Sequence, residues 1–358
     1  MIKTPRSSAV SRLVFAAAAI CFCSLATGQE PPPGGDLFEQ RAEAGGFLAK
    51  GLAFSYGAGF EAPVRPLLSV AAAGIPQDEP PSRGTLFSWN SEGENTGGPR
   101  LDEPLVTDRP DFTESSVAVG RGVVQVEFGY TFTSSTSEGV TVRTQTVGEQ
   151  LLRAGFYADW IEFRLGMIPG LLMNSVDDFD FSFPIAFEQT KSAGVSRSTA
   201  GLTDLYTGLK IALVPQEGLL PEMAVIPQMN IPTGSASFSS DRFEPGVNLV
   251  YGWTLNDSLA TAGSTQVNRS YDDNGEGYVE FAQSWTVACG LSDGLGAFAE
   301  WFAFFPRGTD TAGAQQYLNG GLAWAITDDF QFDIRVGFGL NDEADDFFIG
   351  SGFSFRKP

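Results

Sequence analysis

The sequence has 358 residues, enough for one large domain or two ordinary ones, and a formal net charge of −21. This acidic balance excludes nucleic acid as an expected partner, because neutralising phosphates requires an excess of lysine and arginine. The chain contains no histidine, which excludes Ser-His-Asp and Cys-His nucleophiles, HExxH zinc sites and histidine general bases. Carboxylate-only chemistry remains as an alternative, but no Glu/Asp pair can be assigned acid and base roles. We therefore predict that the protein is not an enzyme.

The first 28 residues have the pattern of an export signal. A basic start is followed by the apolar centre LVFAAAAICFCSLA and by small residues suited to cleavage after Gly28. A membrane anchor is the alternative, but the apolar run is short and no second span follows it. We predict a signal peptide over residues 1–28 and export from the cytoplasm. Only Cys289 would remain in the exported chain, so no intramolecular disulfide can form there.

Residues 29–103 differ in character from the rest of the chain. The stretches PPPGG, GIPQDEPPSRG and SEGENTGGPR are rich in proline and glycine and lack sustained periodicity. We interpret this region as a low-complexity, largely disordered leader that serves as a plain linker. A plug or a docking role for it is the alternative.

From residue 104 to residue 358 the sequence repeatedly alternates apolar and polar residues. VVQVEFGYTF, IEFRLGM and FQFDIRVGF each carry all their charges on one face and none on the other, as a strand between two environments does. Twelve segments of this kind are predicted, near residues 123–133, 147–157, 160–168, 204–213, 222–231, 245–254, 259–267, 278–289, 295–305, 317–326, 330–340 and 346–356.

The connections between these segments alternate in length. Long loops at residues 134–146 and 169–203 are each followed by a tight turn, such as YADW, and the rhythm continues to LNDS and beyond. Separation of short turns from long loops is typical of an antiparallel up-and-down outer-membrane β-barrel, and an even strand number places both ends on the periplasmic side. The apolar face would then contact lipid, and closure would leave no unpaired edge. The alternative is a soluble β-sandwich or ligand-binding barrel with its apolar face turned inward.

The polar face of a membrane barrel lines its lumen. Glu162 and Arg164 on one strand, with Asp333 and Arg335 on another, are expected to satisfy each other across the interior, either to stiffen the barrel or to select solutes. The predicted lumen-lining residues are Gln125, Glu127, Arg153, Glu162, Arg164, Lys210, Gln228, Asn230, Asn248, Glu300, Gln331, Asp333, Arg335 and Arg356. A barrel of twelve strands lies between filled barrels of eight and open porins of sixteen, so a narrow or partly plugged channel is expected.

Three residues ahead of the first strand, Asp108, Arg109 and Asp111, are expected at the periplasmic mouth as a structural latch, with a gate as the alternative. Arg109 would lie between the two carboxylates and either close a salt-bridged lid or tuck into the lumen. Three acidic loop clusters follow later, and one of them, SYDDNGEG, resembles a calcium loop until its final ligand, where Gln283 stands. We therefore predict no metal site and no cofactor, and interpret these clusters as solvated outer loops.

The run LVTDRPDFTESSVAVGRGVVQVEFGYTFT resembles the opening of a family of outer-membrane transporters known from the meta-pathway of phenol degradation. Further likenesses are EQLLRAGFYADWIEFRLG, the PTG after the fifth segment, and DFQFDIRVGFGLNDEADDFFIGSGFSFR. The resemblance covers about residues 105–356 and leaves out the leader. One departure is the ending, because Arg356, Lys357 and Pro358 follow Phe355 where barrel proteins commonly finish on an aromatic residue.

The resemblance implies a transporter or channel in the outer membrane of a Gram-negative-type bacterium, for passive passage of small, aromatic or apolar molecules. Its partners would be the lipid bilayer, the solute and the outer-membrane assembly machinery. The alternative function is a non-conducting structural or adhesive barrel that binds partners through its acidic extracellular loops.

Overall fold

The computed structural model describes residues 84–88, 101–137, 140–170, 187–192, 195–236, 238–272 and 274–357. The predicted signal peptide and most of the predicted leader lie outside these residues. Within them, no helix is long and apolar enough to cross a bilayer.

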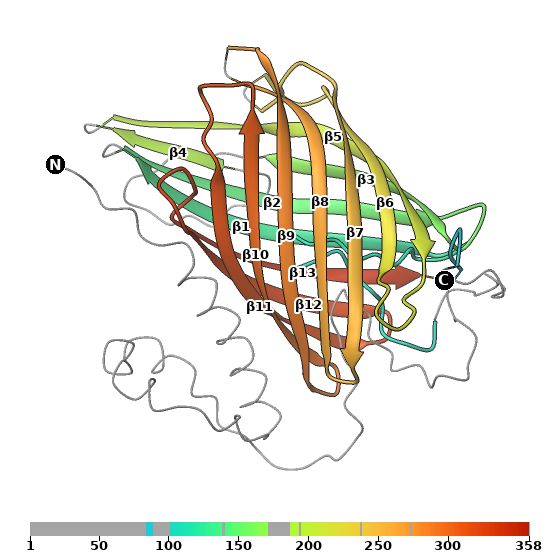
Figure 1. Ribbon diagram of the computed structural model, residues 1–358. Coiled ribbons are helices and arrows are strands. Elements are labelled where there is room, and N and C mark those ends of the chain that lie inside the picture. The colour runs from blue at the N-terminus through green and yellow to red at the C-terminus, as the bar shows by residue number, and fades with distance from the viewer. Residues whose placement is uncertain are drawn as a thin grey trace, which may run out of the picture. The chain divides into compact units, whose positions relative to one another are not determined.

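The described part of the chain is built from thirteen antiparallel strands (Figure 1). Their bounds are β1 Val124–Ser137, β2 Val140–Gly155, β3 Ile161–Gly170, β4 Phe187–Ser192, β5 Val195–Val214, β6 Glu222–Ile231, β7 Glu244–Asn256, β8 Leu259–Tyr271, β9 Gly277–Ser292, β10 Leu295–Arg307, β11 Gln315–Thr327, β12 Phe330–Gly339 and β13 Phe347–Lys357. All twelve predicted segments correspond to strands, and β4 is the additional one.

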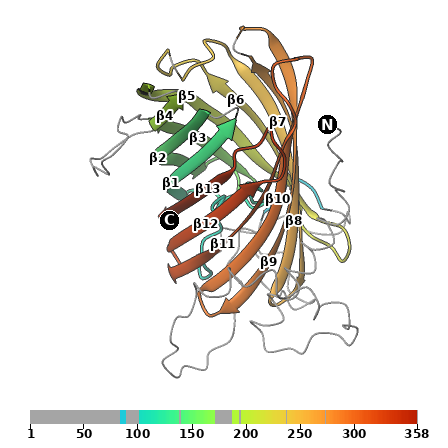
Figure 2. The ribbon, with the colours of Figure 1, turned by 90° about the vertical axis from the view of Figure 1, so that its left-hand side faces the viewer.

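The sheet closes on itself. β1 pairs with β2 on one side, with Val124 opposite Ala154, and with β13 on the other, with Val124 opposite Lys357. Every other strand pairs with its neighbours in the same antiparallel way, and Figure 2 shows the strands arranged around the barrel. Closure satisfies the backbone hydrogen bonds of both would-be edge strands, which is the condition for a sheet to cross hydrocarbon. The fold is therefore the predicted antiparallel β-barrel.

β3 and β4 together fill one position of the ring. β3 pairs with the parts of β2 and β5 that lie nearer the short turns. β4 pairs with the parts farther from the short turns, with Gln145 and Ala200 opposite Phe187. Both run antiparallel to β5, so β4 continues the course of β3 (Figure 1). The thirteen strands thus make a twelve-position barrel.

The two long loops predicted at residues 134–146 and 169–203 are wrong in extent. β1 runs on to Ser137 and β2 begins at Val140, so only residues 138–139 connect them. In the second loop, β4 and the first part of β5 are strand. These strand extensions are rich in serine and threonine on both faces. Threonine is common in strands, but with polar residues on both faces the sequence shows no apolar–polar alternation there. The predicted alternation of long and short connections therefore arises because strands extend beyond their predicted bounds at the end of the barrel opposite the short turns.

Burial in this barrel is the inverse of that in a soluble protein. The outward side chains of β12 and β13 are apolar and exposed, among them Phe338, which is 48% exposed, while Asp333 on the inner face of β12 is 0% exposed. Arg, Lys, Glu and Asp are almost never fully buried unless they are paired. Here they are buried inside the ring and aromatic and aliphatic residues cover its outside, so the soluble alternative with an inward apolar face is wrong.

Candidate functional site in the barrel lumen

The chain enters the lumen before it forms the wall. Residues 105–121, which we call the lumen segment, begin where Leu105 N donates to Asp328 O at the β11–β12 turn, 2.7 Å away. They end where Gly122 N donates to Gly155 O at the end of β2, 3.0 Å away. Both points lie at the short-turn end of the barrel. The lumen segment therefore runs up into the barrel and returns to the same mouth.

Carboxylates of the wall bind backbone N–H groups of the lumen segment. Both oxygens of Glu127 accept from Asp108 N at 3.1 Å. Glu300 accepts from the amides of Phe112 and Thr113, each at 2.7 Å. A segment without regular secondary structure must find partners for its buried amides, and charged acceptors make the stronger hydrogen bonds. Wall carboxylates on different sides of the ring supply them.

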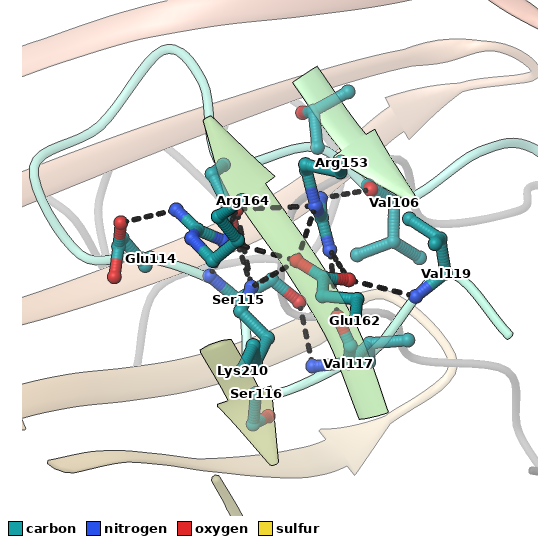
Figure 3. A network of polar contacts seen from close by, with 12 residues as sticks. Val106, Glu114, Ser115, Ser116, Val117, Val119, Arg153, Glu162, Arg164 and Lys210 are labelled. Atoms are coloured by element: carbon teal, nitrogen blue, oxygen red, sulfur yellow. Dashed lines mark hydrogen bonds and ion pairs between the residues drawn. The ribbon is translucent and has the colours of Figure 1, made fainter. Parts of the chain in front are cut away.

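Guanidinium groups of the wall bind backbone carbonyls of the same segment. Arg153 donates to Val106 O at 2.9 Å and to Val117 O at 2.8 Å, so one side chain clamps the ascending and descending limbs (Figure 3). Arg335 of β12, three strands away from β2 around the ring, donates to Pro110 O at 3.0 Å. These wall residues thus hold the segment through its backbone.

Asp108 is the anionic centre of the first charge cluster. Its carboxylate lies 2.8 Å from Lys210 Nζ and 3.3 Å from Arg153 Nε, and it also contacts Arg164. Burial disfavours the charged form of a carboxyl group, but the three neighbouring cations offset this cost at Asp108. The carboxylate therefore stays ionised inside the barrel.

Glu162 completes the Asp108 cluster from the wall. It lies 2.8 Å from Arg153 and 3.1 Å from Arg164, and its other oxygen accepts from Val119 N of the lumen segment at 2.9 Å. Figure 3 shows Arg153, Glu162 and Arg164 converging there. Breaking such a buried pair leaves an uncompensated charge, so the cluster ties the segment to the β2–β3–β5 side of the barrel.

Arg109 forms the second charge cluster, where its guanidinium group lies against two glycines of the wall. It binds Glu149 at 2.7 Å and Asp333 at 3.3 Å. A Cβ atom added to Gly129 or Gly352 would collide with its guanidinium group. These two glycines face each other on β1 and β13. The absence of side chains there gives the guanidinium room to lie against the backbone.

The tip of the lumen segment ends in an aromatic stack. The Phe112 ring lies 4.7 Å from Phe302 with a 10° angle between planes, and Phe302 lies 4.8 Å from Tyr317 at 14°. Phe304 and Phe348 meet the same stack edge-on or tilted. This aromatic cluster sits beyond Glu300, toward the end of the barrel opposite the short turns. It is an aromatic surface inside the barrel, separate from the two charge clusters.

The structure places most predicted lining residues inside the ring. Those fully buried there are Gln125, Glu127, Arg153, Glu162, Arg164, Lys210, Asn248, Glu300, Gln331 and Asp333. Gln228, Asn230 and Arg335 also face the lumen but are partly exposed. Arg356 lies at the short-turn mouth, where it binds Asp329 at 2.7 Å and donates to Glu103 O at 2.9 Å.

Two predicted pairings are wrong. Glu162 and Arg164 do not meet Asp333 and Arg335 across the interior, because the lumen segment lies between them and takes both sets of charges. Arg109 does not lie between Asp108 and Asp111 either, since its partners are Glu149 and Asp333. Asp108, Arg109 and Asp111 lie within the lumen, so Arg109 tucks into the lumen, as one expected alternative had it, and forms no lid across the mouth; Asp111 is buried.

Sequence reasoning missed Glu149, Glu114 and Phe112 as members of the site. Glu149 lies on the same inward face of β2 as Leu151 and Arg153, and a bulge at Gly148 and Glu149, which both adopt positive φ, shifts the alternation at this point. The Gly-Glu pair within an alternating run was the available signal for such a bulge. Within the described residues, no group of three acidic or cysteine side chains gathers as metal ligands would.

The closed ring, apolar exterior and charged interior define the protein class as an outer-membrane β-barrel. Residues 107–356 match the family model described as "Putative MetA-pathway of phenol degradation", and the chain belongs to this family. No curated protein matches the sequence closely enough to count as a relative.

Solved structures of similar fold include the COG4313 outer membrane channel from Pseudomonas putida F1. The identity is 12% and the TM-score 0.53, over 70% of this chain and 99% of that one. The NanC porin is similar at a TM-score of 0.39 and 12% identity, over 65% and 98% of the two chains. The translocator domain of the autotransporter NalP from Neisseria meningitidis gives 0.41 and 10%, over 65% and 87%. At these identities the likeness concerns the fold.

Proposed function

We propose that the protein is an outer-membrane channel for passive passage of small, aromatic or apolar molecules, and that the lumen segment must shift before a solute can pass. The observation that carries this proposal is the position of the segment. Within a few residues it contacts β1 through Asp108, β2 and β12 through Arg109, and β9 and β10 through Thr113. It therefore crosses the lumen, and a solute has to move it or pass around it.

The way the segment is held supports a displaceable element. A covalent or apolar plug would resist entry of water, but this segment is held by ion pairs and by hydrogen bonds to its backbone. Charged groups of the wall that lose the segment can be hydrated again, which lowers the cost of its movement compared with exposure of an apolar core. The aromatic cluster offers an apolar contact surface on the way, in keeping with the family's description.

The remaining partners follow from the same proposal. The apolar exterior fits a lipid bilayer, and export through the signal over residues 1–28 would deliver the chain to the assembly machinery. The last strand carries Phe353 and Phe355 on its outer face, with exposed fractions of 40% and 45%. We propose that the assembly machinery recognises this strand although it ends on Arg356 and Lys357 and not on an aromatic residue. No catalytic role is part of the proposal.

Reconstitution in liposomes tests the channel. We expect wild-type protein to admit small aromatic solutes at a measurable rate and larger sugars slowly or not at all, as judged by release of an entrapped reporter. Protein-free liposomes and liposomes with heat-unfolded protein are the controls. Vesicles that stay sealed to every solute would overturn the proposal and favour the non-conducting alternative, a barrel that binds partners through its outer loops.

A further inference from the structure

One carboxylate of the lumen segment is held by two wall residues from different strands. Glu114 Oε1 contacts Arg164 Nη2 of β3, and Glu114 Oε2 accepts from Asn248 Nδ2 of β7 at 2.9 Å. Arg164 and Asn248 are both completely buried, whereas the Glu114 side chain is 20% exposed. The two donors, Arg164 and Asn248, are thus buried parts of the wall, whereas their acceptor Glu114 is partly accessible. Figure 3 shows Glu114 at its end, facing Arg164.

The charges of the wall around this point favour an anion. The wall supplies three cations, Arg153, Arg164 and Lys210, against the two carboxylates of Glu127 and Glu162. Asp108 of the lumen segment makes this balance neutral, and Glu114 makes it negative by one charge. When Glu114 moves away, the wall presents a guanidinium and an amide with spare donors. Low local dielectric strengthens the attraction of a new anion to such a place.

Two further features favour a ligand at this place. Asn248 Oδ1 is buried and has no hydrogen-bond partner among the described residues. Such a buried orphan acceptor is costly unless water or a ligand supplies a donor. Beside it, the Arg164 guanidinium lies 6.0 Å from the centre of the partly exposed Tyr206 ring. That ring offers an aromatic face next to the cation.

We propose that Arg164 and Asn248 form a binding site for small organic carboxylates, with planar aromatic carboxylates favoured by Tyr206, and that Glu114 occupies this site as an internal competitor. The inference rests on the proposed function in one respect, namely that solutes reach the lumen. A free carboxylate takes the two donors in the same way as Glu114 does, through a charge-assisted hydrogen bond from Arg164 and a neutral one from Asn248. A water that enters with the ligand, or a hydroxyl substituent on the ligand, then donates to Asn248 Oδ1.

Calorimetric titration of the folded, detergent-solubilised full chain with benzoate tests the site. Glu114→Ala removes the competitor, so benzoate should bind this variant roughly tenfold more tightly than the wild type, a difference set by one ionic partner. Benzamide, which has the same shape without the charge, should bind neither protein measurably. The added substitution Asn248→Leu should abolish the gain. Glu280→Gln, a lumenal carboxylate on β9 outside the site, should behave as wild type.

The test remains decisive if Glu114→Ala folds poorly, as judged by the mobility of unboiled protein on a gel. Glu114→Gln keeps the side-chain length and loses only the charge, and it should show a smaller gain in the same direction. Equal affinity of wild type and both Glu114 variants, or equal binding of benzoate and benzamide, would overturn the inference. Liposomes that stay sealed to every solute would overturn the proposed channel but would not change the result of these titrations. Failure of the channel and failure of the carboxylate site are therefore distinguishable.

Discussion

Lys210 Nζ lies 2.8 Å from Asp108 Oδ1, which joins the wall strand β5 to a residue 102 positions earlier in the chain. Both side chains are almost entirely removed from water. The contact shows how the lumen segment is held, because the segment supplies the nearer carboxylate of a buried wall cation, whose wall partner Glu162 lies 3.9 Å away. Several such contacts, distributed around the ring, fix the segment within the barrel.

Asp108→Ala should destabilise the barrel more than any other single change in the segment. It leaves Lys210, Arg153 and Arg164 with one carboxylate fewer, and removing one partner of a buried pair typically costs about 3–5 kcal/mol. The temperature at which the folded band of an unboiled sample disappears on a gel should fall clearly. The same neutralisation at the exposed loop residue Asp310 should leave it unchanged. An Asp108 variant that matches wild type would show that the cluster is not an anchor.

Gly352→Ala should displace Arg109 without changing any charge. The new Cβ would collide with the backbone oxygen of Phe128 on β1 and with the guanidinium group, so Arg109 loses its place against β13 and its ion pairs with Glu149 and Asp333 weaken. We expect faster solute entry into liposomes, because this side of the lumen segment is released. Ser351→Ala, one residue away on the lipid face, is the matched control. Equal rates in both variants would contradict the role assigned to Arg109.

Phe112→Ala should loosen the tip of the segment while the charge clusters stay intact. The stacked ring pair with Phe302 is worth about 0.5–1.5 kcal/mol beyond its burial, so the loss of stability should be modest. Faster hydrogen exchange should appear at Thr113 and neighbouring amides, and not near Asp108. Unchanged exchange at the tip would mean that the aromatic stack does not hold it.

Asp272 at the end of β8 should tie two outer loops together in a pH-dependent way. Its carboxylate accepts from the amides of Asn274 and Glu276 and from the hydroxyls of Thr309 and Thr311. The Glu276 amide is the main cause of a pKa below the ordinary value of 3.8. The tie is therefore present above that pH and is lost as the pH falls through the lowered pKa. Because these donors occupy the carboxylate, Asp272 is poorly placed to take a cation.

Limited proteolysis reports on this tie. Asp272→Asn should increase cleavage in residues 272–276 and 308–314 at neutral pH, and wild type should show the same increase only in strong acid. A variant cut at the wild-type rate would show that the hydrogen bonds of Asp272 do not order the loops. Tyr271→Phe is a control at the preceding position that leaves the carboxylate in place.

The period-two alternation predicted the barrel and its lumen because the two faces of each strand meet opposite environments. Glu127, Glu162 and Asp333 were placed inward correctly, since a charge cannot face lipid cheaply. Their partners were not predictable, because Asp108 and Arg109 bind residues up to 224 positions away. Periodicity assigns a residue to a face, but it does not show which other chain segment occupies the space in front of that face.

The errors in the strands have a local physical cause. The Ser/Thr-rich ends of β1, β2 and β5 carry polar residues on both faces, so the alternation that marks a strand is lost although the backbone pairing continues. Positive φ at Gly148 and Glu149 marks a bulge in β2. The bulge reverses the alternation, because the inward residues are odd-numbered from Glu149 to Arg153 and even-numbered at Thr146 and Gly148.

A reversible cross-link between the lumen segment and the wall tests the central claim most directly. Thr113 Oγ1 and Ser284 Oγ lie 2.6 Å apart, so Thr113→Cys combined with Ser284→Cys, in a Cys289→Ser background, should form a disulfide under oxidation. We predict that oxidised protein in liposomes admits small aromatic solutes far more slowly than the same protein after reduction. Equal rates in the two states, with the cross-link shown to be complete, would contradict a channel that opens by movement of this segment.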